Sequence, residues 1–90
     1  MDLARQGKRC LVTGSTAGIG VEVVRQLAAE GARVVSSGRR DAPGVGEEAH
    51  VVADLSHAGG PEWVVSESAE ALGGLDVLVN NVGSARHARF

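Results

Sequence analysis

The sequence TGSTAGIG, residues 13–20, places three glycines within seven residues, directly after the apolar run of residues 10–12. A short apolar run of this kind is typical of a buried strand, and the glycines stand where that strand would turn into a helix. Such a turn brings the backbone close to a ligand, and the first N–H groups of the helix carry partial positive charge. The stretch therefore predicts a site for a phosphate-bearing ligand.

The rest of the chain alternates apolar runs with helical patterns. Continuous apolar runs predict buried parallel strands at residues 10–12, 34–35, 51–53 and 77–79. Apolar positions spaced three and four apart predict helices over residues 19–30 and 61–72. Between the second and third strands, residues 41–48 read DAPGVGEE and predict a loop. In the second helix, we expect a buried stripe formed by Val65, Ala69 and Leu72.

Strands that alternate with helices predict an α/β fold, with a Rossmann-like parallel sheet covered by helices on both faces. We expect one partial domain over residues 1–90, with about four strands in the order 3-2-1-4. In this order the fourth strand, residues 77–79, leaves an apolar edge. We therefore expect the 90-residue chain by itself to be marginally stable and to self-associate or aggregate.

Composition excludes several classes of function. The formal net charge is −2 and the basic residues are scattered, so we expect neither a nucleic-acid partner nor a membrane surface. The single cysteine, Cys10, excludes an intramolecular disulfide and lies in a predicted buried strand. The histidines lack the spacing of metal ligands, and no long apolar segment follows the N-terminus. We expect a cytoplasmic protein without a metal site.

Each glycine of the first turn has its own predicted purpose. Gly14 permits the sharp turn out of the strand, Gly18 permits close approach of the backbone to a pyrophosphate, and Gly20 permits close packing of helix on sheet. Ser15 and Thr16 would add hydroxyl donors. The spacing G-x-x-x-G-x-G differs from the usual G-x-G-x-x-G, so these glycines alone do not exclude a tight turn without a ligand.

Four segments, taken together, resemble the short-chain dehydrogenase/reductase family. These are Gly7-Lys8, the TGxxxGIG pattern of residues 13–20, Asp54-Leu55, and NNVG at residues 80–83, where the family motif has alanine in place of Val82. The resemblance implies a dinucleotide site in which the glycines hold the pyrophosphate, Asp54 and Leu55 border the adenine, and the asparagines line the ribose and brace the fourth strand. The residues it assigns are Gly14, Ser15, Thr16, Gly18, Ile19, Gly20, Asp54, Leu55, Asn80, Asn81 and Gly83.

The end of the second strand bears on the choice of cofactor. An acidic residue there favours NAD, whereas an arginine accommodates the 2′-phosphate of NADP. The region reads SSGRRD at residues 36–41, so we favour NADP(H), with Arg39 and Arg40 on the phosphate and Ser37 as a further donor. Asp41 keeps NAD(H) possible.

The resemblance implies hydride transfer between NADP(H) and a carbonyl or alcohol. The family uses a serine and a Tyr-x-x-x-Lys pair for catalysis, but this chain has no tyrosine and its only lysine is Lys8. We therefore assign no catalytic residue and expect the 90-residue chain to be inactive alone. The favoured interpretation is the N-terminal part of an oxidoreductase that, at full length, binds a small-molecule substrate and forms a homo-oligomer. A stand-alone, non-catalytic NAD(P)-binding module is the alternative; a methyltransferase is disfavoured by the glycine spacing and Asn80-Asn81.

Overall fold

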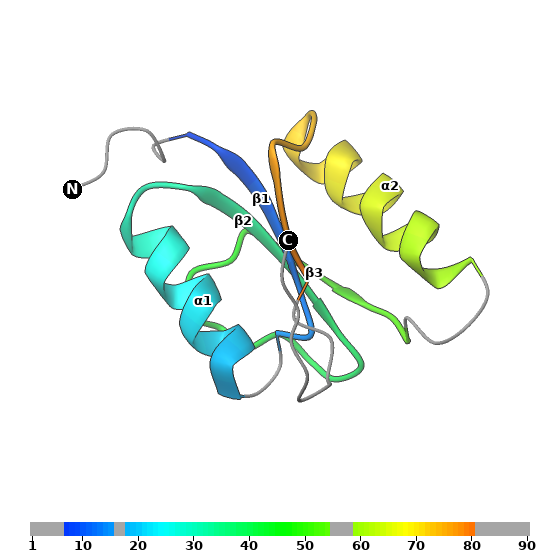
Figure 1. Cartoon of the computed structure of the whole chain (residues 1–90), viewed down its shortest axis with the longest axis horizontal. Coiled ribbons are helices and arrows are strands. Elements are labelled where there is room, and N and C mark those ends of the chain that lie inside the picture. Colours follow the sequence, from blue (N-terminus) through cyan, green and yellow to red (C-terminus); the bar gives the residue numbers. More distant parts are fainter. Residues whose placement is uncertain (1–6, 16–17, 55–58, 81–90) are drawn as a thin grey trace.

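The computed structural model describes residues 7–15, 18–54 and 59–80 of the chain. The elements follow one another as strand, helix, strand, strand, helix, strand (Figure 1). They are β1 (Arg9–Thr13), α1 (Gly18–Ala29), β2 (Arg33–Gly38), β3 (Ala49–Val52), α2 (Gly60–Leu72) and β4 (Val77–Asn80). Neither described helix is long and apolar enough to cross a membrane. As predicted, residues 41–48 form no helix.

The strands form one parallel sheet in the order β3-β2-β1-β4, which confirms the predicted topology. β1 is paired on both sides: Leu11 lies opposite Val35 of β2 and opposite Leu78 of β4. Figure 1 shows α1 and α2 on opposite faces of this sheet. The fold is therefore the predicted two-faced α/β arrangement, with β1 at its centre.

The core has two halves, because successive residues of a strand point to opposite faces of the sheet. On the α1 face, one cluster is formed by the buried residues Cys10, Val12, Val24, Leu27 and Val34. On the α2 face, the other is formed by the buried residues Leu11, Val35, Val64 and Leu72. The centre of β1 is fully enclosed, which explains its continuous apolar run.

The buried stripe of α2 differs from the predicted one. Val64, Ser68 and Leu72 are buried, whereas Val65 is 40% exposed, so its predicted burial is wrong. Ser68 can occupy a core position because its hydroxyl donates to the carbonyl of Val64 at 2.7 Å, which satisfies its polar group within the helix. A stripe read only from apolar residues passes over this serine and shifts by one position.

β4 ends the strand order beside β1, as expected. Val77 is 39% and Leu78 is 45% exposed, whereas Val79 packs against the core cluster of the α1 face. Within the described part of the chain, no strand pairs with the outer side of β4. The apolar edge predicted from the sequence is thus present at Val77 and Leu78, while self-association of the chain stays a prediction.

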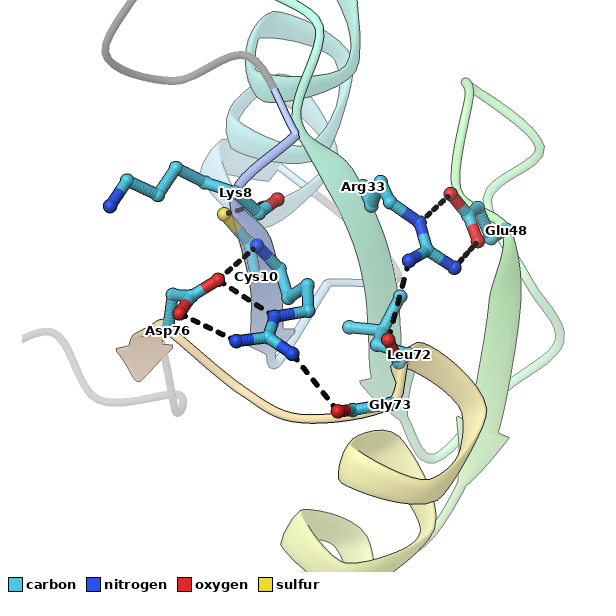
Figure 2. A network of polar contacts seen from close by, with 8 residues as sticks. Lys8, Cys10, Arg33, Glu48, Leu72, Gly73 and Asp76 are labelled. Atoms are coloured by element: carbon cyan, nitrogen blue, oxygen red, sulfur yellow. Dashed lines mark hydrogen bonds and ion pairs between the residues drawn. The ribbon is translucent and has the colours of Figure 1, made fainter.

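A charged side chain stands at or just before the first residue of every strand. Arg9 begins β1 and donates through Nε and a terminal nitrogen to the two carboxylate oxygens of Asp76, at 2.9 and 3.0 Å, just before β4. Its other terminal nitrogen donates to the carbonyl of Gly73, which follows α2 (Figure 2). Hydrogen bonds from the side chain and backbone of Arg9 hold the pKa of Asp76 well below its usual range.

A second arginine repeats this arrangement on the neighbouring pair of strands. Arg33 begins β2 and forms a two-bond ion pair with Glu48, just before β3, at 3.0 and 3.1 Å. It also donates to the carbonyl of Leu72, the last residue of α2 (Figure 2). The last turn of α2 has no basic residue of its own, so Arg9 and Arg33 supply the positive charge that its final carbonyls favour.

The corrected stripe can be tested with two neighbouring substitutions. Val64→Ala should lower the free energy of unfolding by about 2 kcal/mol, because it removes two buried methyl groups at ~0.8 kcal/mol each and leaves a cavity. Val65→Ala is the matched control and should change it by less than about 1 kcal/mol. Urea unfolding followed by circular dichroism measures both. Equal losses of unfolding free energy in the two variants would contradict the corrected stripe and support the predicted burial of Val65.

The ion pair at Asp76 predicts a pH-dependent stability. Because its pKa is lower in the folded than in the unfolded chain, the pair contributes fully above the ordinary aspartate pKa of about 4. The contribution is lost as the pH falls through the lower folded value. Asp76→Asn should therefore lower the melting temperature at pH 7 and match the wild type in strong acid. The control Glu67→Gln removes an exposed carboxylate from α2 and should leave the melting temperature close to that of the wild type at both pH values.

Candidate functional site

The predicted site residues gather at one edge of the sheet. Gly14 follows β1, Arg39 follows β2, Asp54 lies two residues beyond β3, and Asn80 ends β4. Since all four strands are parallel, their carboxyl ends meet at this edge, which is where open α/β sheets bind ligands. The amino ends, with the ion pairs of Arg9 and Arg33, form the opposite edge.

Gly14 and Gly18, the glycines on either side of residues 16–17, have unusual backbone conformations. Gly14 and Gly18 have φ values of 69° and 59°, in the left-handed region that side chains rarely adopt. A Cβ added to Gly18 would meet no atom within 4 Å, so the space above the start of α1 is open. The first turn of α1 has no acidic residue that would compete with an anion, and Gly20 is buried as predicted. Ile19 beside it is 73% exposed.

Ser15 forms a structural contact in addition to the contact predicted for it. Its side chain is fully buried, and both its N–H and its hydroxyl donate to the carbonyl of Ser37, each at 3.1 Å. The one hydroxyl proton is thereby used inside the protein, and the donation from Ser15 to a ligand stays a prediction. Ser15 ties the glycine loop to the end of β2, a link that only the strand register brings into view.

Ser37 is also enclosed. It is 1% exposed, and its hydroxyl has no hydrogen-bond partner among the described residues. In β2 it faces the same side as Val35, which belongs to the α2 half of the core. A hydroxyl in this position does not face solvent, and the phosphate contact predicted for Ser37 has no support in the geometry.

Arg39 and Arg40 directly follow β2 and are exposed. Neither guanidinium forms an ion pair or hydrogen bond with any described residue, whereas the other described arginines each bind a carboxylate: Arg9, Arg25 and Arg33. Asp41 is exposed beside them. The end of β2 therefore offers two positive groups that have no partner among the described residues.

Asn80 is joined to the end of β1. Its side-chain oxygen accepts a hydrogen bond from the hydroxyl of Thr13 at 2.9 Å, and the two residues are paired in the register of β1 and β4. This hydrogen bond joins β4 to β1, and the contact from Thr13 is one that the sequence alone does not reveal. Its place next to Gly14 makes the contact a direct link between the glycine loop and β4.

Of the remaining predicted residues, the structure describes only Asp54. Asp54 is half-buried beyond β3. Four predicted residues lie outside the described part of the chain: Thr16, Leu55, Asn81 and Gly83. Within the part that is described, no group of three histidine, cysteine, aspartate or glutamate side chains could hold a metal ion.

Comparison with known proteins gives the context of this edge. The family model described as short chain dehydrogenase matches residues 8–90. The chain is 38% identical over 87 residues to a D-beta-hydroxybutyrate dehydrogenase of Cupriavidus necator, covering 86% of the chain and 34% of that protein. It is 41% identical over 97 residues to an L-xylulose reductase of Bos taurus, covering 94% and 36%. The chain spans about a third of the length of these curated relatives.

Solved structures agree in fold. An NADH-dependent reductase complexed with NAD superimposes with a TM-score of 0.79 at 33% identity, covering 90% of this chain and 38% of that one. A short-chain dehydrogenase from Burkholderia cenocepacia in complex with NADP gives 0.78 at 38% identity, covering 92% and 38%. The family match extends over the glycine loop and all four strands that carry the site. On this evidence the chain belongs to the short-chain dehydrogenase family of oxidoreductases, of which it contains the nicotinamide-dinucleotide-binding Rossmann part.

Proposed function

We propose that this chain is the NADP(H)-binding N-terminal part of a short-chain dehydrogenase that, at full length, transfers hydride between NADP(H) and a carbonyl or alcohol substrate. The observation that carries the proposal is the pair of exposed guanidiniums of Arg39 and Arg40 after β2, for which the described part of the chain provides no partner. Related structures contain NAD in one case and NADP in another, so the relatives leave the choice open. The residues after β2 favour NADP, because a guanidinium matches the charge and geometry of a 2′-phosphate.

The described residues fit a dinucleotide in three respects. The start of α1 supplies the N–H groups and positive partial charge of a helix N-terminus for the pyrophosphate, and a Cβ at Gly18 would meet open space. Arg39 and Arg40 supply two cations at the same edge of the sheet. Ile19 supplies exposed apolar surface between the glycine loop and solvent, against which a ring or ribose can pack.

Other residues complete the proposed site. In this proposal Asp54, two residues beyond β3, accepts a hydrogen bond from the adenine amino group, and Asn80 lines the ribose while it remains bonded to Thr13. The resemblance adds Thr16, Leu55, Asn81 and Gly83 to the proposed set. When bound, the nicotinamide supplies or accepts the hydride; the residues of this chain hold and orient the cofactor, and we assign none of them to proton transfer.

A substitution in the glycine loop tests pyrophosphate binding. Gly18→Ala should weaken NADPH and NADH by a similar factor of roughly tenfold or more, because both share the pyrophosphate and the added Cβ occupies the open space above α1. Gly7→Ala is the matched control, since Gly7 also has a left-handed φ, of 76°, and open space at its Cβ. Isothermal titration calorimetry measures both. If both variants weaken cofactor binding equally, the effect comes from backbone strain and not from a lost pyrophosphate contact.

Removal of the two free guanidiniums tests the choice of NADP. The double variant Arg39→Ala/Arg40→Ala should raise the Kd for NADPH by roughly 10- to 100-fold, the value of charge-assisted hydrogen bonds at 1.5–3 kcal/mol, and leave NADH nearly unchanged. Arg25→Ala, which removes an exposed arginine from α1, should change neither. If the wild type binds NADH as tightly as NADPH, the NADP assignment is wrong.

A further inference from the structure

A histidine on β3 contacts the turn that carries the two free arginines. His50 lies opposite Ser36 in the register of β3 and β2, so both side chains point to the same face of the sheet. The ring nitrogen Nδ1 lies 2.6 Å from the hydroxyl of Ser36, and Nε2 lies 2.7 Å from the backbone carbonyl of Arg40. The imidazole thus connects a buried serine to the turn after β2.

The two contacts fix the roles of the ring nitrogens. A carbonyl oxygen only accepts, so Nε2 carries the proton and donates to Arg40. In the neutral ring Nδ1 then accepts from the hydroxyl of Ser36, and both nitrogens are satisfied. Ser36 is fully buried, which gives the ring a rigid support. The contact orients the ring toward Arg40 rather than leaving it free to rotate.

The turn is held at further points. The carbonyl of Gly38 accepts from the N–H of Ala53, so the end of β2 is tied to the end of β3. Farther along, Val45 packs against the core cluster of the α1 face. A Cβ on Gly46 would lie 2.7 Å from the Cβ of Ala28, which shows how closely the loop approaches α1. Between these points, the hydrogen bond donated by His50 holds the backbone of Arg40 itself.

We propose that His50, supported by Ser36, is a positioning residue for the 2′-phosphate of the cofactor; this inference rests on the proposed NADP function. By holding the carbonyl of Arg40, the ring sets the direction in which the backbone at Arg40 leaves β2 and hence where the adjacent guanidiniums of Arg39 and Arg40 stand. Two long exposed side chains on a fixed backbone lose less freedom when they close on a phosphate. His50 does not itself touch the phosphate in this proposal.

The test compares two small ligands with the 90-residue chain. The first is 2′,5′-ADP, which carries the 2′-phosphate, and the second is 5′-AMP, which lacks it; calorimetry gives a Kd for each. The His50→Ala variant should bind 2′,5′-ADP roughly three- to tenfold more weakly, as expected for one lost hydrogen bond, and should keep its affinity for 5′-AMP within about twofold. Val52→Ala, on the same strand, should change neither Kd.

Two further variants separate positioning from simple destabilisation. His50→Gln should restore most of the lost affinity, because its amide nitrogen can donate to the Arg40 carbonyl. Ser36→Ala keeps the imidazole but removes its support and should weaken 2′,5′-ADP selectively. It also gives the same comparison should His50→Ala fail to fold.

The outcomes divide clearly. A wild type that binds 2′,5′-ADP no more tightly than 5′-AMP would overturn the proposed NADP function itself. A wild type with a preference for 2′,5′-ADP that His50→Ala and Ser36→Ala leave intact would overturn only the role of His50. Equal weakening of both ligands by these variants would assign the residue to general stability and also overturn the proposal. Selective weakening with rescue by His50→Gln would support it.

Discussion

The parallel pairing of β1 with both of its neighbours is the constraint on which the rest of the molecule depends. β1 is enclosed by β2 and β4 at its sides and by the two halves of the core above and below. Because every strand runs the same way, one edge of the sheet collects all the carboxyl ends and the other collects all the amino ends. The predicted ligand-binding groups and the structural ion pairs are thereby separated to opposite edges of a small protein.

Arginine serves a different purpose at each edge, and the surroundings decide which. At the amino edge, Arg9 and Arg33 are neutralised by Asp76 and Glu48 and also donate to the last carbonyls of α2. At the carboxyl edge, Arg39 and Arg40 have no carboxylate partner among the described residues. Surface ion pairs contribute little individually, but bonds that join strand ends to a helix end fix how α2 lies on the sheet. The unpaired arginines keep their full capacity for an external anion.

The topology and the glycine loop could be predicted because each depends on local patterns. Apolar runs marked the strands, glycines marked the turns, and the spacing of segments along the chain indicated the family. β2 was predicted too short, at residues 34–35, because Ser36 and Ser37 are polar; both are buried within Arg33–Gly38. The buried stripe of α2 was predicted wrongly for the same reason, because Ser68 is polar and yet buried. The hydroxyls of Ser36 and Ser68 have hydrogen-bond partners that a linear pattern does not display, whereas the hydroxyl of Ser37 is buried without a partner among the described residues.

The site was harder to predict because its contacts depend on strand register. The links from Ser15 to Ser37, from Thr13 to Asn80 and from His50 to Ser36 each join two strands or a strand and its neighbouring loop. No spacing rule along the chain shows which residues a parallel pairing sets side by side. The sharp turn predicted at Gly14 needs no register, because glycine itself permits the left-handed backbone that Gly14 and Gly18 adopt.

The register of β4 also has a consequence for how the chain closes. Ser36 and His50, on β2 and β3, are 14 residues apart, whereas Arg9 and Asp76, and Thr13 and Asn80, are 67 residues apart. Loop-closure entropy therefore opposes the docking of β4 by about 1.4 kcal/mol more, at ~0.6 kcal/mol per doubling of length. β4 has no strand on its outer side within the described residues, and two of its apolar side chains lie partly in water, so in this part of the chain it is the natural first element to open in local unfolding. Its departure would release Asp76 from Arg9 and Asn80 from Thr13 together. A single opening event would thus loosen both the contacts of Arg9 at the end of α2 and the edge of the sheet that carries the predicted site.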